Sequence, residues 1–541
     1  MKTLFNLNLF LPILSGILIT LAFPKWNLWI LGFLGLVPLF WALTQAKNFI
    51  QALVCGFLFG LFHFATLVYW IVYTLTKYGE LNLFFSIFLL FLMCSYLALY
   101  YALGLTIAYR CHIFDNPTLT KGWLLSLAWV GIEWLRANLF TGFPWGQIGY
   151  IATNLSLVLQ LAEIGGVWFL SFFLVFTNYF LFLLFKKLSE NQGYLKTFFG
   201  LHTWIFFLST ILIMISGFYL KTHWEKIIKE EPKELRVALL QGNIPQEIKE
   251  AKQLETSFQV YRKLALKVLK EKPDLILFPE TAFNFYFPYE TKHTVELLRL
   301  LTDIGAEGKN FNLTPRIVFG TFRLSYTEGK PMAYNSLMVW DGKDFVDFYD
   351  KVKLVPFGEY VPLVEYFPFL KNFSVVTDVI RPGFSKNLYV PLDTGFIKVT
   401  PLICFESAFG EILKERLKEN TQLVFIATND AWFGQTSAPY QHFQMAILRA
   451  VESRRFTIQV ANSGITGVVD PTGKITTQTS LEVEIASTTV IKPLYHPTLF
   501  VKTGHIFGLI GVLTLGLMGL LALLFPLKIL SFNFIFNHKK R

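Results

Sequence analysis

Three apolar runs in this sequence each end on a residue suited to acid–base or nucleophilic chemistry. Glu280 follows the run in LILFPETAF, Cys404 follows the run in PLICFES, and Asn429 with Asp430 follows the run in IATNDAWFG. Each run is typical of a strand, and reactive groups are often found where a strand ends and the chain turns. These residues are therefore the first candidates for a reactive site.

A fourth segment, YDKVKLVPFGEYVP, supplies Lys351, Lys353 and Glu359. A thiol is a weak nucleophile until a base or a nearby cation favours the thiolate, and a carboxylate with a lysine can do both. Acyl transfer also needs donors for the developing oxyanion, and an ammonium and the backbone N–H of Phe405 could provide them. Cysteine, glutamate and lysine together therefore predict an acyl-transfer site that does not use histidine. No metal is expected, because the sequence has no CxxC, HExxH or EF-hand loop.

Each candidate also has a simpler interpretation. A lone cysteine at a strand end is usually an inert apolar residue, Glu280 could cap the following turn, and either lysine could be a solvated surface charge. Cys404 nevertheless stands apart from the other three cysteines, all of which lie in the apolar first part of the chain. An unpaired thiol in an oxidising compartment, where structural cysteines are paired, favours a chemical role.

The composition indicates a membrane protein, since 53% of the 541 residues are hydrophobic and only 16% are charged. A bilayer span needs about 20 apolar residues. Seven such stretches lie near 5–23, 26–45, 49–76, 82–109, 120–138, 155–185 and 198–220, and an eighth lies near 503–530. We expect the first to be a retained helix, because no small-residue cleavage site follows it; a cleaved signal peptide is the alternative.

The positive charges predict the orientation of these spans. One side would collect Lys2, Lys47, Arg110, Lys121, Lys186, Lys187, Lys196, Lys539, Lys540 and Arg541, whereas the short loops of the other side hold little beyond Lys25 and Lys77. Positive loops stay in the cytoplasm, so both termini are expected there and the segment 221–502 outside. The formal charge of +11 then reflects topology and anionic lipid head groups rather than nucleic-acid binding.

Three domains follow from the change of composition along the chain. Residues 1–220 would form a bundle of about seven helices, and 503–541 a last helix with a basic tail. Between them, 221–502 alternates strand-like runs with amphipathic stretches at 252–271, 291–303, 407–418 and 437–453, which predicts an α/β or layered α+β domain.

Several motifs together resemble those of the apolipoprotein N-acyltransferase family, membrane-embedded members of the nitrilase superfamily. They are FPET, YDKVKLVPFGEYVP, ICFES and NDAWFG followed by APYQHFQMAILRAVESRR; LAFPKWNLWILGFLGLVPLFWAL and TGFPWGQIGY resemble the family's membrane part. The likeness covers nearly the whole chain. It implies a multi-pass helical membrane domain with an extracytoplasmic αββα nitrilase-like domain, in the bacterial inner membrane.

The resemblance also implies an activity and its residues. A fatty acyl chain would move from a phospholipid, through a cysteine thioester, to the α-amine of a diacylglyceryl-cysteine at the N-terminus of an apolipoprotein. Glu280 would be the general base, Lys351 the oxyanion-stabilising lysine and Cys404 the nucleophile. Lys351 is preferred to Lys353 because it precedes Glu359 by eight positions. Supporting or substrate-binding roles would fall to Glu359, Phe405, Glu406, Trp432 and Phe433. Neither cofactor nor metal is implied, and a monomer is expected.

Two positions depart from the family pattern. Phe405 stands where many members have tyrosine, so a hydroxyl contact is lost while the backbone N–H remains, and Glu250 stands where many have a tryptophan. His442 in YQHFQ could be an alternative base, but a packed helix histidine is the expectation.

The segment PFGEYVPLVEYFPFLKNFSVV carries too many apolar residues for a solvated loop. They are Tyr360, Leu363, Val364, Tyr366, Phe367, Phe369, Leu370 and Phe373. We expect this segment to dip into the membrane interface as a mobile lid, with burial against its own domain as the alternative.

Two other functions fit parts of the sequence. A membrane-tethered amidase would use the same Cys, Glu and Lys. A transporter would fit the number of helices, but Glu133, Arg136 and Glu163 are nearly the only charges inside the spans, which leaves few polar groups for a transport path.

Overall fold

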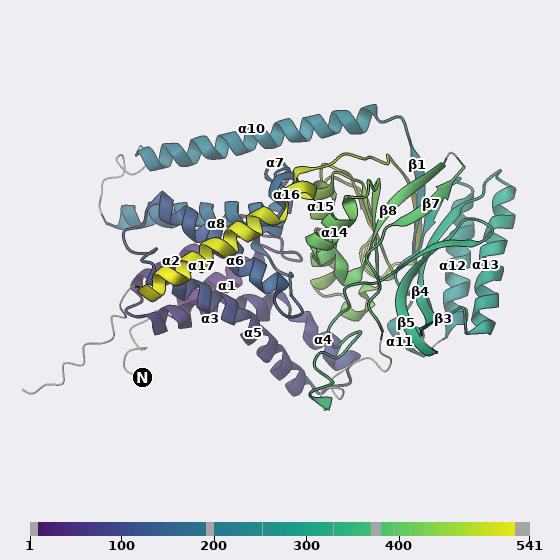
Figure 1. The fold of residues 1–541 in the computed structure, drawn as a ribbon, viewed down its shortest axis with the longest axis horizontal. Coiled ribbons are helices and arrows are strands. Elements are labelled where there is room, and N and C mark those ends of the chain that lie inside the picture. Colours follow the sequence, from purple (N-terminus) through teal and green to yellow (C-terminus); the bar gives the residue numbers. More distant parts are fainter. Residues whose placement is uncertain are drawn as a thin grey trace, which may run out of the picture.

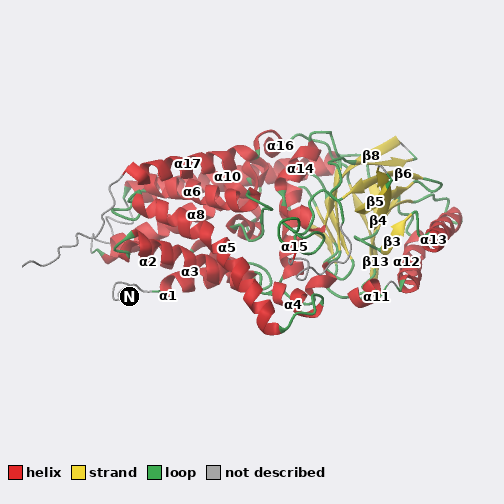
Figure 2. Cartoon of the chain, turned by 60° about the horizontal axis from the view of Figure 1, so that its bottom comes forward, coloured by secondary structure: helices red, strands yellow, loops and turns green. Residues whose placement is uncertain are grey.

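The computed structural model describes residues 9–190, 200–251, 253–327, 329–368, 380–393 and 395–524. It has two parts, a helical bundle and a layered α/β domain that share a long interface (Figure 1). Figure 2 shows that the strands are confined to the second part, whereas the first part is made of helices.

The bundle contains the helices that precede the α/β domain and the one that follows it. They are α1 Phe10–Leu21, α2 Val37–Gln45, α3 Phe49–Leu67, α4 Trp70–Lys77, α5 Leu83–Arg110, α6 Leu119–Asn138, α7 Ser156–Leu159, α8 Ala162–Ser189, α10 Leu201–Glu230 and α17 His505–Leu524, with 3₁₀ segments η1 Trp29–Phe33 and η2 Ile148–Asn154. Within the described residues, five helices are long and apolar enough to cross a membrane: 49–67, 83–110, 162–189, 203–230 and 506–524.

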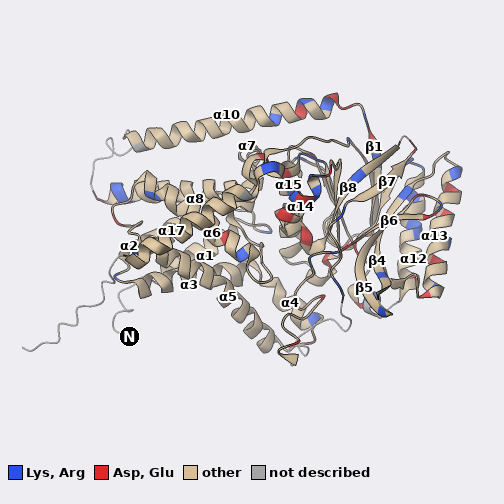
Figure 3. Cartoon of the chain, in the orientation of Figure 1, with Lys and Arg blue, Asp and Glu red and all other residues tan. Residues whose placement is uncertain are grey.

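Three of the expected spans differ from single helices. The stretch 26–45 divides into η1 and α2, the stretch 49–76 divides into α3 and α4, and the stretch 155–185 divides into α7 and α8. The stretch at 120–138 corresponds to α6, which carries the buried Glu133 and Arg136. Charged side chains otherwise gather on the α/β domain and near the ends of the bundle helices (Figure 3). The last part of the stretch 503–530 lies outside the described residues.

The α/β domain contains two β-sheets. Its strands are β1 Leu235–Gln241, β2 Leu275–Leu277, β3 Phe283–Phe287, β4 Arg316–Thr327, β5 Lys330–Trp340, β6 Phe345–Asp350, β7 Leu388–Leu392, β8 Gly395–Ile403, β9 Leu423–Thr428, β10 Thr457–Ala461, β11 Gly467–Val469, β12 Ile475–Gln478 and β13 Ile485–Ile491. In the described chain one sheet has the order β13-β1-β2-β4-β5-β6, with β3 beside β4, and the other has the order β12-β11-β10-β9-β8-β7. The run TIQVANSGITGVVD forms two strands, β10 and β11, which pair antiparallel across a turn.

Helices cover the outer face of each sheet. They are α11 Gln246–Glu250, α12 Leu254–Leu269, α13 Thr291–Lys309, α14 Gly410–Leu417, α15 Ala438–Ser453 and α16 Leu499–Thr503, with the 3₁₀ turns η4 Cys404–Ala408 and η5 Asp430–Phe433. Apolar side chains of the two sheets meet in one core; α12 and α13 pack on the first sheet, and α14 and α15 on the second. The domain is therefore an αββα sandwich, whose α14–α15 layer faces the bundle (Figure 1).

Candidate active site

The strand order brings the candidate residues to one end of the sandwich. Strands β8 and β9 are parallel, and Ile403 pairs with Ala427, so Cys404 and Asn429 follow at the same edge. In the other sheet, Glu280 lies in the loop after β2. That loop passes so close to β4 that a Cβ on Gly320 would lie 2.5 Å from the carbonyl oxygen of Pro279, which only glycine permits.

Lys351 is buried between two carboxylates. Its Nζ lies 3.2 Å from Oε1 of Glu280 and 2.9 Å from Oε1 of Glu359. Burial lowers the pKa of the Lys351 ammonium, but the two carboxylates outweigh it and raise the pKa well above its usual value. The lysine therefore carries its charge at any physiological pH. The alternative lysine, Lys353, points elsewhere, with its Nζ 4.8 Å from the ring centre of Phe409.

Two asparagines hold these carboxylates: Asn429, which was among the candidates at the strand ends, and Asn335, which was not. The side-chain nitrogen of Asn335 donates to Oε1 of Glu280 at 2.8 Å and to Oε1 of Glu359 at 2.9 Å. The backbone N–H of Asn429 donates to Oε2 of Glu280 at 2.9 Å. A polar residue within the apolar run AYNSLMVW was the available signal for Asn335.

Cys404 adopts a strained backbone conformation at the end of β8. Its φ is 51°, a left-handed value that costs a residue with a side chain about 1–3 kcal/mol. Burial, followed by the charge of Glu280, raises the pKa of the Cys404 thiol well above its usual value, and Lys351 opposes this. The resting thiol is thus protonated, and a base is needed to activate it.

Glu406 has a structural place next to the site. It is fully buried and accepts hydrogen bonds from the backbone N–H groups of Val352 at 2.7 Å and Ile403 at 2.8 Å, and from the hydroxyl of Tyr349 at 2.7 Å. These bonds join the segment that carries Lys351 to the segment that carries Cys404. Among the contacts of the described residues, Glu406 has no hydrogen bond with Glu280, Lys351 or Glu359.

The three aromatic candidates border the site on the side of the bundle. The ring of Phe405 is buried and packs edge-on against Phe409, and its backbone N–H lies in the first turn of η4, where N–H groups lack intrahelical partners. Trp432 packs edge-on against Tyr78, with ring centres 5.1 Å apart. Phe433 packs likewise against Trp70 at 4.8 Å. The last two therefore join η5 to α4.

Lys249 was missed by the sequence analysis. It is 3% exposed, and its Nζ has no hydrogen-bond partner among the described residues. Burial lowers the pKa of this amine to about 7, although the nearby charge of Glu280 opposes the shift. The helix that carries it, α11, also carries Gln246, whose Oε1 accepts from the side chain of Asn429 at 2.9 Å. The side chain of Glu250 lies outside the described part.

His442 is the packed helix histidine that was expected, but it contacts the turn that carries the nucleophile candidate. Its Nδ1 lies 2.8 Å from Oδ1 of Asp430, and its Nε2 lies 2.8 Å from Oγ of Ser407 and 3.1 Å from the carbonyl oxygen of Cys404. Donor atoms of Cys404, Asp430 and His442 lie within 4.8 Å of one another. Both ring nitrogens are already engaged, however, so the set does not suit a metal ion.

The candidate lid is described as far as residue 368. Leu363 is 61%, Tyr366 76% and Phe367 49% exposed, whereas Tyr360 and Val364 are half-buried. Phe369, Leu370 and Phe373 lie outside the described residues. Large exposed apolar side chains so close together are typical of a membrane or ligand contact.

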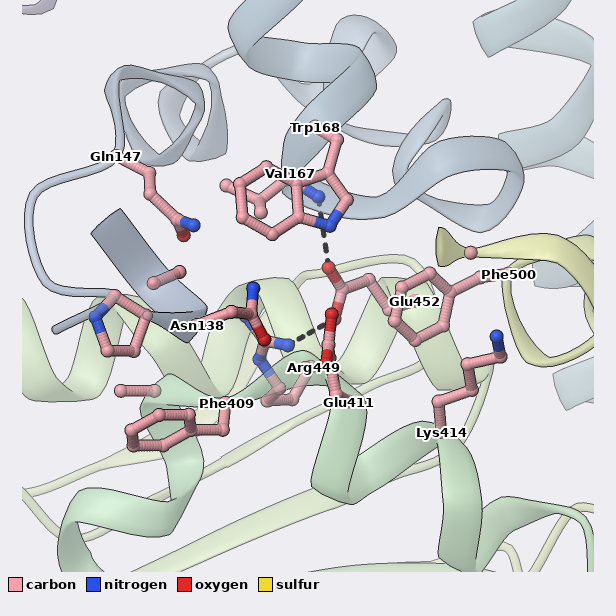
Figure 4. A pocket seen from close by; sticks show the side chains of 15 residues that line it. Asn138, Gln147, Val167, Trp168, Phe409, Glu411, Lys414, Arg449, Glu452 and Phe500 are labelled. Carbon is pink, nitrogen blue, oxygen red and sulfur yellow. Dashed lines mark hydrogen bonds and ion pairs between the residues drawn. The ribbon is translucent and has the colours of Figure 1, made fainter. Parts of the chain in front are cut away.

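A separate cavity of about 20 Å³ lies between the bundle and the α14–α15 layer (Figure 4). Arg449 and Glu452 form an ion pair of 2.6 Å at its wall, and Glu452 also accepts from the backbone N–H of Val167 at 3.1 Å. None of Glu280, Lys351 and Cys404 lines this cavity. Its volume suits about one water molecule and not an acyl chain.

Comparisons with known proteins agree with this architecture. Residues 236–493 match the family model for carbon–nitrogen hydrolases, so the sandwich with its Glu, Lys and Cys is a nitrilase-superfamily domain. Residues 15–180 match the model of the apolipoprotein N-acyltransferase N-terminal domain.

Relatives extend the match over most of the chain. An apolipoprotein N-acyltransferase of Geobacter metallireducens is 33% identical and covers 87% of either chain. That of Nitrosomonas europaea is 31% identical over 89% of this chain and 90% of its own. The chain belongs to the apolipoprotein N-acyltransferase family of bacterial membrane proteins.

Solved structures similar to this chain include nitrilase-superfamily proteins. Nit3 of Saccharomyces cerevisiae is 18% identical, with a TM-score of 0.36, and the match covers 51% of this chain and 94% of Nit3. An amidase of Nesterenkonia is 16% identical, with a TM-score of 0.35 over 50% of this chain and 95% of its own.

Proposed function

We propose that this chain N-acylates apolipoproteins, with Cys404 as the nucleophile, Glu280 as the general base and Lys351 as the oxyanion-stabilising cation. The observation that carries the assignment is the buried contact of Lys351 with Glu280 beside a strained cysteine turn. The raised pKa of the Cys404 thiol supports a separate base, since the resting thiol is not a nucleophile.

The first half-reaction forms a thioester. Glu280 takes the thiol proton while the sulfur attacks the carbonyl carbon of a phospholipid ester. Lys351 and the backbone N–H of Phe405 stabilise the oxyanion. When the tetrahedral intermediate collapses, the ester C–O bond breaks, and the departing alkoxide of the lysophospholipid takes the proton from Glu280.

The second half-reaction forms an amide. The α-amine of the diacylglyceryl-cysteine attacks the thioester, Glu280 removes an amine proton, and Cys404 leaves as the thiol. The same residues serve both halves, so the order is ping-pong. Ester to amide exchange is downhill, and the balance requires neither a nucleotide nor a metal.

The supporting residues differ in how directly they contact the proposed catalytic groups. Glu359 orients Lys351 by accepting a hydrogen bond from its ammonium, and Asn335 holds both carboxylate partners of Lys351 by donating to Glu280 and Glu359. Glu406 joins the two catalytic segments. Trp432 and Phe433 pack against α4 and its C-terminal end rather than touching the reacting groups.

The proposed orientation has the sandwich outside the cytoplasm and both termini inside. It is supported by the ends of α5 and α8, which carry Arg110, Lys186 and Lys187. Figure 1 shows that α17 runs away from the sandwich, so it ends at the far end of the bundle. All proposed groups come from one chain, so the unit that acts is taken to be a monomer.

A two-substrate assay tests the function. The purified protein is incubated with a phospholipid and a synthetic diacylated lipopeptide, and the products are separated by mass. Wild type is expected to give triacylated lipopeptide and lysophospholipid in equal amounts, and Glu280→Gln neither. Release of ammonia from a lipid-free amide, with no triacylated product, would instead favour an amidase.

A further inference from the structure

Helix α15 lies between the sheet that carries Cys404 and the membrane bundle. One of its faces packs in the core formed with β8, β9 and α14, and another packs in the core of the bundle. At the second face Gln441 makes several polar contacts with the bundle, beside those of Gln444, Arg449 and Glu452. Oε1 of Gln441 accepts from the indole N–H of Trp145 at 2.8 Å and of Trp70 at 3.3 Å, and its Nε2 donates to the carbonyl oxygens of Pro24 and Leu67, both at 3.2 Å.

The next residue, His442, faces the nucleophile turn. Because a carboxylate can only accept, Nδ1 donates to Asp430. A protonated Nε2 donates to the carbonyl oxygen of Cys404 at 3.1 Å, whereas an unprotonated Nε2 accepts from the hydroxyl of Ser407 at 2.8 Å. The arrangement with a protonated Nε2 is that of an imidazolium. Burial opposes this state, but the carboxylate of Asp430 outweighs it and raises the pKa of His442.

Ser407, His442 and Asp430 have the hydrogen-bond pattern of a Ser–His–Asp triad. Ser407 is fully buried, however, and a ring with both nitrogens protonated cannot take the proton of its hydroxyl. The three groups therefore do not supply a second nucleophile. What the imidazolium reaches is the backbone of Cys404, in the left-handed conformation that needs support from its surroundings.

We infer that His442 is a positioning residue for the nucleophile, and that α15 fixes the Cys404 turn relative to the membrane bundle through Gln441. The inference rests on the proposed role of Cys404. His442 holds the peptide group that follows Cys404, and this same group carries the N–H of Phe405 that faces the oxyanion. Through these contacts the bundle helps to set the catalytic geometry.

The expected loss of acylation rate follows from how closely the reacting atoms must be positioned. Displacing a reacting group by about 1 Å can cost about 100-fold in rate. Loss of the bond from His442 frees the carbonyl of Cys404, and loss of Gln441 removes four contacts with the bundle while leaving the imidazolium in place. Both changes should slow acylation, and only the first should change the reactivity of the thiol itself.

The test measures single-turnover acylation of the full-length protein in lipid nanodiscs. After mixing with a phospholipid of defined chains and quenching, intact mass gives the rate of acyl-enzyme formation. The variants are His442→Phe, His442→Gln and Gln441→Leu. The matched control is Tyr440→Phe, which removes an α15 hydroxyl that has no hydrogen-bond partner in the described part of the chain. Thermal melting measures folding of each variant.

His442→Phe is expected to lower the acylation rate on the order of 100-fold and Gln441→Leu on the order of 10-fold. His442→Gln should recover part of the loss through its amide N–H. The donor concentration for half-maximal rate should stay unchanged, and Tyr440→Phe should match wild type. Folded His442→Phe or Gln441→Leu that acylates at the wild-type rate would overturn the inference.

Alkylation of Cys404 by iodoacetamide separates this inference from the proposed function. The charged groups facing the ring of His442 are Asp430 and Glu280. In His442→Phe the carboxylate of Asp430 loses its cation, so the thiol pKa should rise and alkylation should slow several-fold, whereas Gln441→Leu keeps the wild-type pH profile. If wild type forms no acyl-enzyme, the proposed function fails, and the alkylation rates still decide the role of His442: an unchanged rate in His442→Phe refutes it.

Discussion

Replacing Lys351 by methionine should lower both stability and activity. Stability should fall because two carboxylates lose their cation, and the acylation rate should fall because an oxyanion donor is lost. The side chain is 1% exposed and bonds two buried carboxylates at 3.2 and 2.9 Å. Removing one partner of such a buried pair costs about 3–5 kcal/mol. For a domain of this size 1 kcal/mol shifts Tm by roughly 2–4 °C, so a decrease on the order of 10 °C is expected. Loss of one oxyanion donor lowers the rate by roughly 100- to 1000-fold.

The two carboxylates that remain in Lys351→Met should make the stability of this variant depend on pH. Glu280 and Glu359 would both face the amide nitrogen of Asn335 without a cation, so one should bind a proton in the folded state. Its folded pKa would then exceed the unfolded value of about 4.3. Because the folded state binds more protons, the free energy of unfolding should fall as pH rises from about 5 to 8.

A second substitution separates the two effects. Glu359→Gln added to Lys351→Met removes one of the two repelling charges, so Tm should recover by several degrees while the acylation rate stays low. The assay is thermal melting in detergent between pH 5 and 8, alongside single-turnover acylation. Lys353→Met is the matched control, because Lys353 contacts an aromatic ring and not these carboxylates. Equal Tm values for wild type and Lys351→Met at pH 8 would refute the reasoning.

Two further predictions concern groups around the site. Tyr366→Ser with Phe367→Ser should slow acylation from long-chain donors in nanodiscs but change Tm and iodoacetamide alkylation little, because Tyr366 is 76% and Phe367 49% exposed. Equal loss with short- and long-chain donors would contradict a membrane contact. Lys249→Met should raise Tm near pH 7, since a buried amine without a partner is removed. The folded pKa of Lys249 is about 7, below the unfolded value of about 10.4, so wild-type stability should rise with pH between 7 and 10 and close the gap to the variant. A gap that does not change with pH would exclude this interpretation.

The fold was predicted as far as local patterns reach. The change of composition separates the bundle from the α/β domain, and the amphipathic stretches at 252–271 and 437–453 correspond to α12 and α15. Apolar length alone did not reveal the break in the stretch 26–45, because η1 and α2 are both apolar and the turn between them depends on packing. The αββα layering itself came from the resemblance, since periodicity cannot say which strands are neighbours.

At the site, the sequence indicated the residues that belong to recognisable motifs. It did not indicate the residues that reach the site only because the fold places their segments beside it. Glu280, Lys351 and Glu359 lie together as the motifs suggested. Lys249 could not be found, and Asn335 appeared only as a polar residue in an apolar run, because their roles depend on contacts between segments far apart in the chain. His442 was correctly expected to be packed, but its bond with Cys404 exists only once α15 lies against η4.

The central claim is that Cys404 carries the acyl chain, and intact mass of the protein after incubation with a phospholipid tests it most directly. Wild type is expected to gain the mass of one acyl group, Cys404→Ala none, and addition of a diacylated lipopeptide should remove the adduct as triacylated product. An adduct that persists in Cys404→Ala, or triacylated product formed without any adduct on wild type under single-turnover conditions, would contradict the account.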